Sequence, residues 1–155
     1  MASGPPTGAS RSAKRLKKEY DDIVKAGTFP THVTGDISHE WIVTMKGADG
    51  TLYRGEQFRL RFIFTADYPI EAPEVVFVDP VPVHPHIYSN GHICLSILYD
   101  QWSPALRVDS VCMSILSMLS SADGKARPPD NDSYVSRVGS RSPKQTRWDF
   151  HDTKA

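Results

Sequence analysis

The stretch HPHIYSNGHICLSIL, residues 84–98, decides how the fold of the chain is interpreted. It places His84, His86 and His92 within eleven positions of Cys94. The stretch lies inside residues 79–106, which hold four prolines and no sustained helical or strand period. A loop of this length inside a compact domain is unusual and is commonly functional. We therefore expect the function to reside in this loop.

Histidines beside a cysteine are compatible with four kinds of site. A zinc site could use all four side chains, but their spacing, H-x-H-x5-H-x-C, matches no common structural zinc pattern. A Cys–His hydrolase needs an oriented base, and its cysteine gains from opening a helix, which Cys94 does not do. A thiol that carries an acyl group as a thioester needs only partial exposure, a groove and a donor for the oxyanion. A purely structural cysteine is the fourth reading, and the residues alone leave these alternatives open.

The composition predicts one soluble domain. The chain has 155 residues, of which 39% are hydrophobic and 23% charged, as in ordinary globular proteins. Lys+Arg and Asp+Glu number 18 each, so neither nucleic acid nor a membrane is an expected partner. The first residues lack the apolar segment of a secretory signal. With two cysteines there is no disulfide framework, and we expect a reducing compartment, the cytoplasm or the nucleus.

The first half of the predicted domain begins with a helix. Residues 1–11 are rich in Ser, Gly and Pro and are expected to be disordered, with Ser12 capping a helix that ends at Gly27. The apolar face of this helix consists of Leu16, Tyr20, Ile23 and Val24. Its basic face consists of Lys14, Arg15, Lys17 and Lys18. A solvated face and a docking patch are both compatible with this basic surface.

A change of period after Pro30 predicts strands. Apolar residues alternate with polar ones over 41–45 and 58–64, and the segment GADGTLYRG between them carries turn signals. The short apolar run VVFV is typical of a buried strand, and the whole reads as an antiparallel meander packed on helices. A helix follows over 107–121 with Cys112 on its buried face, and a short helix is expected near 131–138.

These motifs, in this order, resemble the ubiquitin-conjugating enzyme family. The resemblance rests on HPHIYSNGHICLSIL, followed by WSPAL and the helix SVCMSILSMLSS, and covers roughly residues 13–138. Earlier in the chain, KRLKKE, GADGTLYRG and YPIEAPEVVF fall in the family's order. The resemblance implies the α+β fold of that family. This fold is a four-stranded antiparallel meander with an N-terminal helix, C-terminal helices and a long active-site loop. Residues 12–138 would form the catalytic core.

Within the family, the sequence is most similar to the W-type subgroup. It shares HPH in place of the usual His-Pro-Asn, CLSIL in place of CLDIL, and RPPDN after the long helix. Residues 139–155 would then be the W-type tail, RSPKQTRWDFHD at its centre, and this tail can be mobile. The subgroup modifies disordered protein N-termini, so substrates with free N-termini are the implied acceptors.

The resemblance assigns roles residue by residue. Cys94 is the thioester nucleophile, and the basic face formed by Lys14, Arg15, Lys17 and Lys18 docks the ubiquitin-activating enzyme. Ile70, together with Ser103, Pro104 and Ala105, contacts RING or U-box ligases. No metal and no bound cofactor are expected, because ATP is consumed by the activating enzyme. Partners are therefore ubiquitin, the activating enzyme, ligases and protein substrates.

Departures from the family pattern bear on mechanism. The usual asparagine of His-Pro-Asn is His86 here, so His86 and Asn90 are candidates for stabilising the oxyanion or ordering the loop. Ser96 replaces an aspartate, and Asp130 and Asn131 are candidates for the gate that receives the acceptor. A lysine, with a pKa of about 10.4, needs acidic help to lose its proton, whereas an α-amine, with a pKa of about 7.7–8.0, needs less.

A site poor in acids therefore predicts a preference for N-terminal α-amines. Conventional conjugation to lysine, carriage of another ubiquitin-like protein and a non-catalytic ubiquitin-binding variant are the alternatives.

Overall fold

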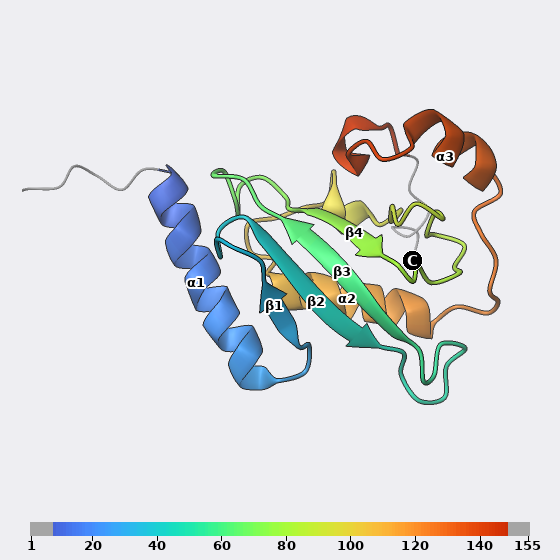
Figure 1. Cartoon of the computed structure of the whole chain (residues 1–155), viewed down its shortest axis with the longest axis horizontal. Coiled ribbons are helices and arrows are strands. Elements are labelled where there is room, and N and C mark those ends of the chain that lie inside the picture. Colours follow the sequence, from blue (N-terminus) through green and yellow to red (C-terminus); the bar gives the residue numbers. More distant parts are fainter. Residues whose placement is uncertain (1–7, 149–155) are drawn as a thin grey trace, which may run out of the picture.

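The computed structural model describes residues 8–148 and is built around one antiparallel sheet (Figure 1). Its strands are β1 (Thr31–Val33), β2 (Glu40–Lys46), β3 (Gln57–Ile63) and β4 (Glu74–Val78). They lie side by side in the order in which they follow along the chain, and every neighbouring pair is antiparallel. This is the predicted meander.

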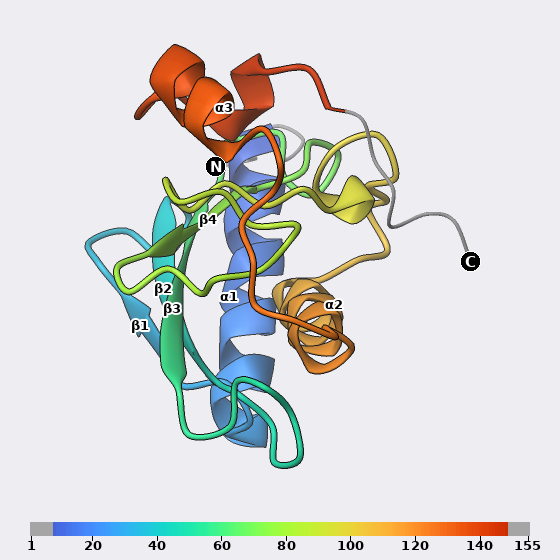
Figure 2. The same ribbon diagram turned by 90° about the vertical axis from the view of Figure 1, so that its right-hand side faces the viewer.

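Two long helices cover one face of this sheet, as Figure 2 shows. They are α1 (Gly8–Ala26) and α2 (Val108–Ser120). The shorter helix α3 (Asn131–Val138) lies beyond the end of β4, and two short 3-10 turns occur at Ser96–Leu98 and Pro143–Gln145. The predicted α+β class and the short helix near 131–138 are confirmed.

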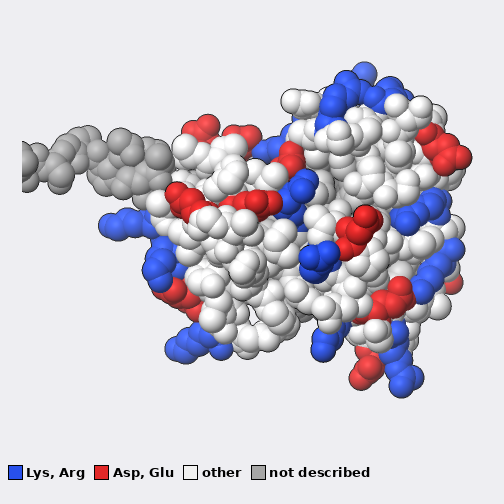
Figure 3. All heavy atoms as spheres, viewed as in Figure 1, with Lys and Arg blue, Asp and Glu red and all other residues white. Residues whose placement is uncertain are grey.

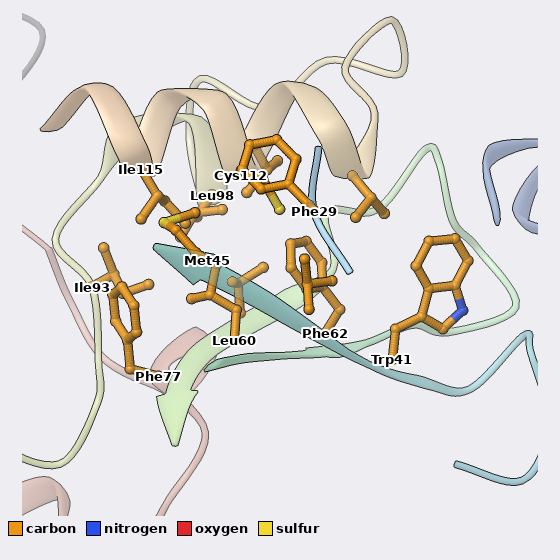
Figure 4. Packing of buried hydrophobic residues seen from close by; sticks show 14 of the residues in the cluster. Phe29, Trp41, Met45, Leu60, Phe62, Phe77, Ile93, Leu98, Cys112 and Ile115 are labelled. Atoms are coloured by element: carbon orange, nitrogen blue, oxygen red, sulfur yellow. The ribbon is translucent and has the colours of Figure 1, made fainter. Parts of the chain in front are cut away.

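The core lies between the sheet and the two long helices. Trp41, Val43 and Met45 of β2 are buried, while their neighbours along the strand are more exposed. The same alternation runs through β3, so period two places one face of each strand against the helices. Cys112 points from α2 into this core and is fully buried (Figure 4). Burial raises the pKa of the Cys112 thiol far above its usual range, which confirms its predicted structural role.

Helix α1 differs in two respects from the sequence-based expectation. It begins at Gly8 and not at Ser12, so residues 8–11 of the predicted disordered extension are helical. The Ser12 hydroxyl donates to the carbonyl of Thr65 and packs the helix onto a loop. Val24, predicted to face the core, is 51% exposed. Gly27 ends the helix as expected, with a positive φ of 73°.

A buried carboxylate, Glu19, connects three parts of the fold. It is 2% exposed and accepts a hydrogen bond from the Tyr68 hydroxyl at 2.7 Å and from Arg15 Nε at 2.7 Å. Its other oxygen accepts from the backbone N–H of Val108 at 2.8 Å. Val108 is the first residue of α2, where an unpaired N–H and the helix dipole both favour an anion. Glu19 thereby joins α1, the loop at Tyr68 and the start of α2.

We expect the Glu19→Ala variant to lose about 2–5 kcal/mol of unfolding free energy, because it removes the acceptor of two donors, the Tyr68 hydroxyl and the Val108 N–H. Urea unfolding measures this loss. Asp21→Ala is the matched control, since Asp21 is an exposed partner of Lys17 at i, i+4, worth about 0.5 kcal/mol or less. If Glu19→Ala cost no more than Asp21→Ala, this connecting role would be wrong.

Candidate functional site

A tight turn at Asn90 and Gly91 builds the loop that carries Cys94. Gly91 has a φ of 91°, and a Cβ there would lie 2.1 Å from the carbonyl oxygen of Phe77, so only glycine fits. The turn folds the chain back on itself, and Ile87 pairs with Ile93. The N–H of Cys94 then donates to the carbonyl of His86 at 2.8 Å. Cys94 is therefore held by backbone pairing across the loop.

Two of the three histidines brace this loop. His84 is 3% exposed; its Nε2 donates to the carbonyl of Met118 at 3.1 Å, and its Nδ1 accepts from the N–H of His86 at 2.9 Å. Burial lowers the pKa of His84 to about 4. His92 is also buried, with Nδ1 2.7 Å from the Tyr134 hydroxyl, and burial lowers its pKa as well. Both rings therefore make hydrogen bonds that stabilise the fold.

The buried neutral His84 makes stability fall in acid. The unfolded chain protonates this ring below about pH 6.5, whereas the folded chain does so only near pH 4. The unfolded state thus binds more protons between these values, and the stabilisation present above pH 6.5 is lost as the pH falls. We expect the urea midpoint to drop less between pH 7 and pH 4.5 in His84→Gln, which has no titratable ring. Equal pH slopes in the two proteins would contradict this assignment.

The Cys94 side chain opens into a pocket of about 690 Å³. The thiol residue itself is 8% exposed. Residues of three separate segments share the pocket wall, among them His86, Tyr88, Asp130, Arg137 and Trp148. The pocket is large enough for an extended peptide end to reach the sulfur.

Aromatic rings form one side of this pocket, and sequence reasoning did not find them. Tyr88 and Tyr134 stack at 3.8 Å between ring centroids, and Trp148 stacks on Tyr99 at 4.9 Å. Burial raises the pKa of Tyr88, Tyr99 and Tyr134 above the usual range, and the nearby Cys94 contributes in the same direction. The segment RWDFH of the tail could have indicated these rings, because it contains more aromatic residues than a solvated tail usually does. Its last three residues lie outside the described part of the chain.

The two candidates for the oxyanion are placed differently. His86 is half-buried and lines the Cys94 pocket. The Asn90 amide donates to the carbonyl of Gly139 at 2.9 Å, and its oxygen accepts from the N–H of His92. Asn90 lies in a separate hollow with Ser142 and other residues. The geometry therefore favours a loop-ordering role for Asn90 and leaves His86 beside the thiol.

One acid lies in the pocket wall, the gate candidate Asp130, so the site is poor in acids but not without them. Asp130 lines the pocket and accepts from the Tyr88 hydroxyl at 2.9 and 3.1 Å. Asn131 accepts from the backbone N–H of Ser89 at 2.9 Å and so ties α3 to the loop. Ser96, in place of an acid, is 2% exposed.

The basic face of α1 is only partly available to a partner. Lys14, Lys17 and Lys18 are exposed, the last two also pairing with acids one turn later. Arg15 instead donates to the carbonyls of Pro104 and Leu106, each at 3.0 Å, besides pairing with Glu19. Its guanidinium thereby supports the loop predicted to contact ligases. Figure 3 shows acidic and basic side chains interspersed over the face in view.

The predicted ligase surface is exposed. Ile70 is 76% exposed at a loop tip, and Pro104 and Ala105 are exposed on the second loop, with Ser103 half-buried beside them. Trp102 donates its indole N–H to the carbonyl of Pro69 at 2.8 Å and so joins the two loops. Trp102 therefore packs between the two loops.

Within residues 8–148, no group of three or more His, Cys, Asp or Glu side chains is arranged to hold a metal ion. Over the same range, no helix is long and apolar enough to cross a bilayer.

Comparison with protein families supplies the identity. The family model described as "Ubiquitin-conjugating enzyme" matches residues 15–151. This chain belongs to the ubiquitin-conjugating enzyme family. Among curated relatives of this ubiquitin-conjugating enzyme, a probable ubiquitin-conjugating enzyme E2 W of Dictyostelium discoideum is 55% identical over 144 residues, covering 92% of this chain and 97% of the relative. Ubiquitin-conjugating enzyme 15 of Arabidopsis thaliana is 54% identical, covering 92% and 90%.

Solved structures of ubiquitin-conjugating enzymes share the fold. The enzyme UbcA1 of Agrocybe aegerita has a TM-score of 0.79 and 45% identity, covering 86% of this chain and 98% of that one. Human ubiquitin-conjugating enzyme E2 G1 has a TM-score of 0.66 and 29% identity, covering 72% and 96%. These findings confirm the resemblance, the fold and the transferase class of this ubiquitin-conjugating enzyme.

Proposed function

We propose that the protein accepts ubiquitin as a thioester on Cys94 and transfers it to a protein amine. The observation that supports this most directly is the contrast between the two cysteines. Cys94 opens into a pocket of about 690 Å³, whereas Cys112 is sealed in the core. The Cys94 sulfur attacks the thioester carbonyl on the activating enzyme, whose own thiolate leaves. One thioester replaces another, so no strong driving force is needed at this step.

A charging reaction tests this function. The protein is mixed with activating enzyme, ATP and ubiquitin, and the products are separated on a non-reducing gel. We expect a band larger by one ubiquitin that disappears when a thiol reductant is added. If a working activating enzyme produced no such band, the thioester function with ubiquitin would be wrong, and carriage of another ubiquitin-like protein would be tested in the same way.

We propose further that a RING or U-box ligase docks on Ile70 and the loop of Pro104 and Ala105. Ile70 is 76% exposed at a loop tip, and Pro104 and Ala105 are exposed on the loop joined to it. Apolar side chains exposed together in this way favour an interaction site. The Trp102–Pro69 hydrogen bond and the contacts of Arg15 give both loops a fixed backbone. A prearranged surface loses little conformational entropy when a partner binds.

We expect Ile70→Ala to lower ligase-stimulated discharge about tenfold or more, since central apolar anchors contribute about 1–2 kcal/mol or more to binding. The rate of discharge is measured with and without a purified RING domain. Leu52→Ala is the control, because Leu52 is 47% exposed on the loop between β2 and β3. Charging should be unchanged in both variants. An equal loss of ligase-stimulated discharge in the Leu52 variant would contradict the proposed ligase surface.

For the acceptor we propose the N-terminal α-amine of a disordered protein segment. The pocket wall carries one carboxylate, Asp130, and two guanidinium groups, Arg137 and Arg147. Asp130 is already engaged by Tyr88. A lysine reaches such a pocket almost entirely as an ammonium ion, which the arginines repel, whereas an α-amine is partly neutral. The Dictyostelium discoideum relative named E2 W is 55% identical to this chain over 144 residues.

A further inference from the structure

Residues 139–148, which we call the tail strap, are fastened to the edge of the sheet. The Ser142 hydroxyl donates to the carboxylate of Glu74, the first residue of β4. Two residues later, Lys144 pairs with Glu71 at 2.9 Å and donates to the carbonyl of Ala72. Pro143 between them is buried. Three polar contacts, made by Ser142 and Lys144, therefore fasten the strap to β4 and the loop before it.

The tail strap carries Trp148 to the Cys94 pocket. The Trp148 indole N–H donates to the carbonyl of Pro143 at 2.9 Å, and its ring stacks on Tyr99. Arg147 and Trp148 both line the pocket that contains Cys94. The position of this aromatic wall thus depends on contacts made by Ser142 and Lys144.

Ser142 is also the most modifiable residue of the tail strap. It is followed by proline and flanked by Arg141 and Lys144, which is the sequence form that proline-directed protein kinases take. Its φ of −59° and ψ of 136° are those of extended polyproline II backbone. Ser140, Arg141 and Gln145 around it are exposed. Ser142 itself is half-buried, and Pro143 is buried at the start of a 3-10 turn. A kinase therefore reaches Ser142 when the tail strap opens locally, which does not require the core to unfold.

We propose that Ser142 is a phosphorylation site for a proline-directed kinase, and that its modification detaches the tail strap from β4. In this step the Ser142 Oγ attacks the γ-phosphorus of ATP held by the kinase and forms a new O–P bond. The bond from the γ-phosphorus to the bridging oxygen breaks, ADP leaves with that electron pair, and the hydroxyl proton passes to the kinase's catalytic carboxylate.

The local charges decide the direction of the effect. Esterification removes the O–H that Glu74 accepts, and it places a charge of about −1.5 to −2 beside that carboxylate. The phosphate also attracts the Lys144 ammonium, which Glu71 now holds. Either response removes a contact between the strap and the sheet. The strap therefore loosens, and Trp148 leaves the pocket wall.

The test combines phosphate mapping with hydrogen exchange. The full chain is incubated with a purified proline-directed kinase and ATP, and mass spectrometry locates the phosphate. We expect phosphate on Ser142, and exchange in residues 139–148 faster by about tenfold or more, as for the loss of one or two charge-assisted hydrogen bonds. Exchange in α2 should stay unchanged. Phosphate on Ser142 with unchanged exchange, or failure to modify Ser142, would overturn the proposal.

Matched variants separate charge repulsion from a simple structural defect. Ser142→Asp should loosen the tail strap, and Ser140→Asp, two residues earlier on an exposed position, should not. Adding Glu74→Lys to Ser142→Asp restores protection, because opposite charges now face each other across the same contact. Equal loosening in the Ser140 variant, or no rescue by Glu74→Lys, would contradict the mechanism.

The effect on ubiquitin transfer rests on the proposed function and is measured separately. Charging of Cys94 on a non-reducing gel should be the same before and after phosphorylation, because the strap does not hold the thiol. A loosened strap together with normal charging would support both the phosphorylation proposal and the proposed function. Loosened strap in a protein that never charges would overturn the proposed function alone.

Discussion

We expect the Cys94→Ala variant to form no ubiquitin adduct, and Cys112→Ala to charge as the unmodified protein does. Cys94 is the thiol that reaches a pocket, and Cys112 is fully buried between sheet and α2. A thioester requires a sulfur that can meet an incoming carbonyl carbon, and burial raises the pKa of Cys112, which keeps it an inert thiol. The expected loss is total, measured as the fraction of protein shifted on a non-reducing gel.

The Cys94→Ser variant tests the same assignment through the chemical stability of the adduct. The serine oxygen occupies the same place in the pocket, so slow transfer yields an oxygen ester that survives a thiol reductant. The wild-type adduct is cleaved under the same conditions. Cys112→Ala costs only the packing of one buried sulfur, about 1–2 kcal/mol, and should leave a folded enzyme. If the adduct formed on Cys94→Ala and was lost in Cys112→Ala, the assignment of the nucleophile would be reversed.

We expect discharge onto an N-terminal α-amine to exceed discharge onto lysine by on the order of a hundredfold at pH 7. About 10–17% of a peptide α-amine is neutral at this pH, against about 0.04% of a lysine. The pocket gives lysine little help, because Asp130 is engaged by Tyr88 and faces two arginines. The measurement compares a lysine-free peptide with a free N-terminus against its N-acetylated, lysine-containing twin, using the ubiquitin-charged protein.

The pH dependence and one variant provide controls for this preference. Above about pH 8 the α-amine is mostly neutral, while neutral lysine still rises about tenfold per pH unit, so the ratio should shrink. Arg137 is an exposed residue of α3 on the pocket rim. Arg137→Glu replaces its repulsion with attraction and should raise the lysine rate. If the unmodified protein discharged ubiquitin faster onto the acetylated twin, the proposed preference would be wrong.

The elements that sequence predicts well are those that depend on local period. Alternation in β2 and β3 follows from one face packing on helices, so the buried positions could be read directly from the chain. The N-terminal helix was predicted too short, because a stretch rich in Gly and Ser before Ser12 has weak helix propensity. The helix nevertheless begins at Gly8.

The part of the site that lies in one continuous sequence motif was predictable. The part that side chains from distant segments form together in space was not. Cys94 stands in a continuous motif, and its loop is shaped by the Asn90–Gly91 turn. Tyr99, Tyr134 and Trp148 come from three distant segments, and no spacing in the sequence relates them. The role of Arg15 was hidden for a related reason. Its partners are backbone carbonyls of a loop, which have no signature in the side-chain sequence.

The order of the sheet has a consequence for synthesis. Strands β1 to β4 pair only with their immediate successors, so the sheet can assemble from local contacts while later residues are still being added by the ribosome. The Cys94 pocket is different, since its wall needs Asp130, Tyr134 and Trp148. A nascent chain that already has its sheet therefore still lacks a finished pocket. The pocket wall is complete only after Trp148 has been added.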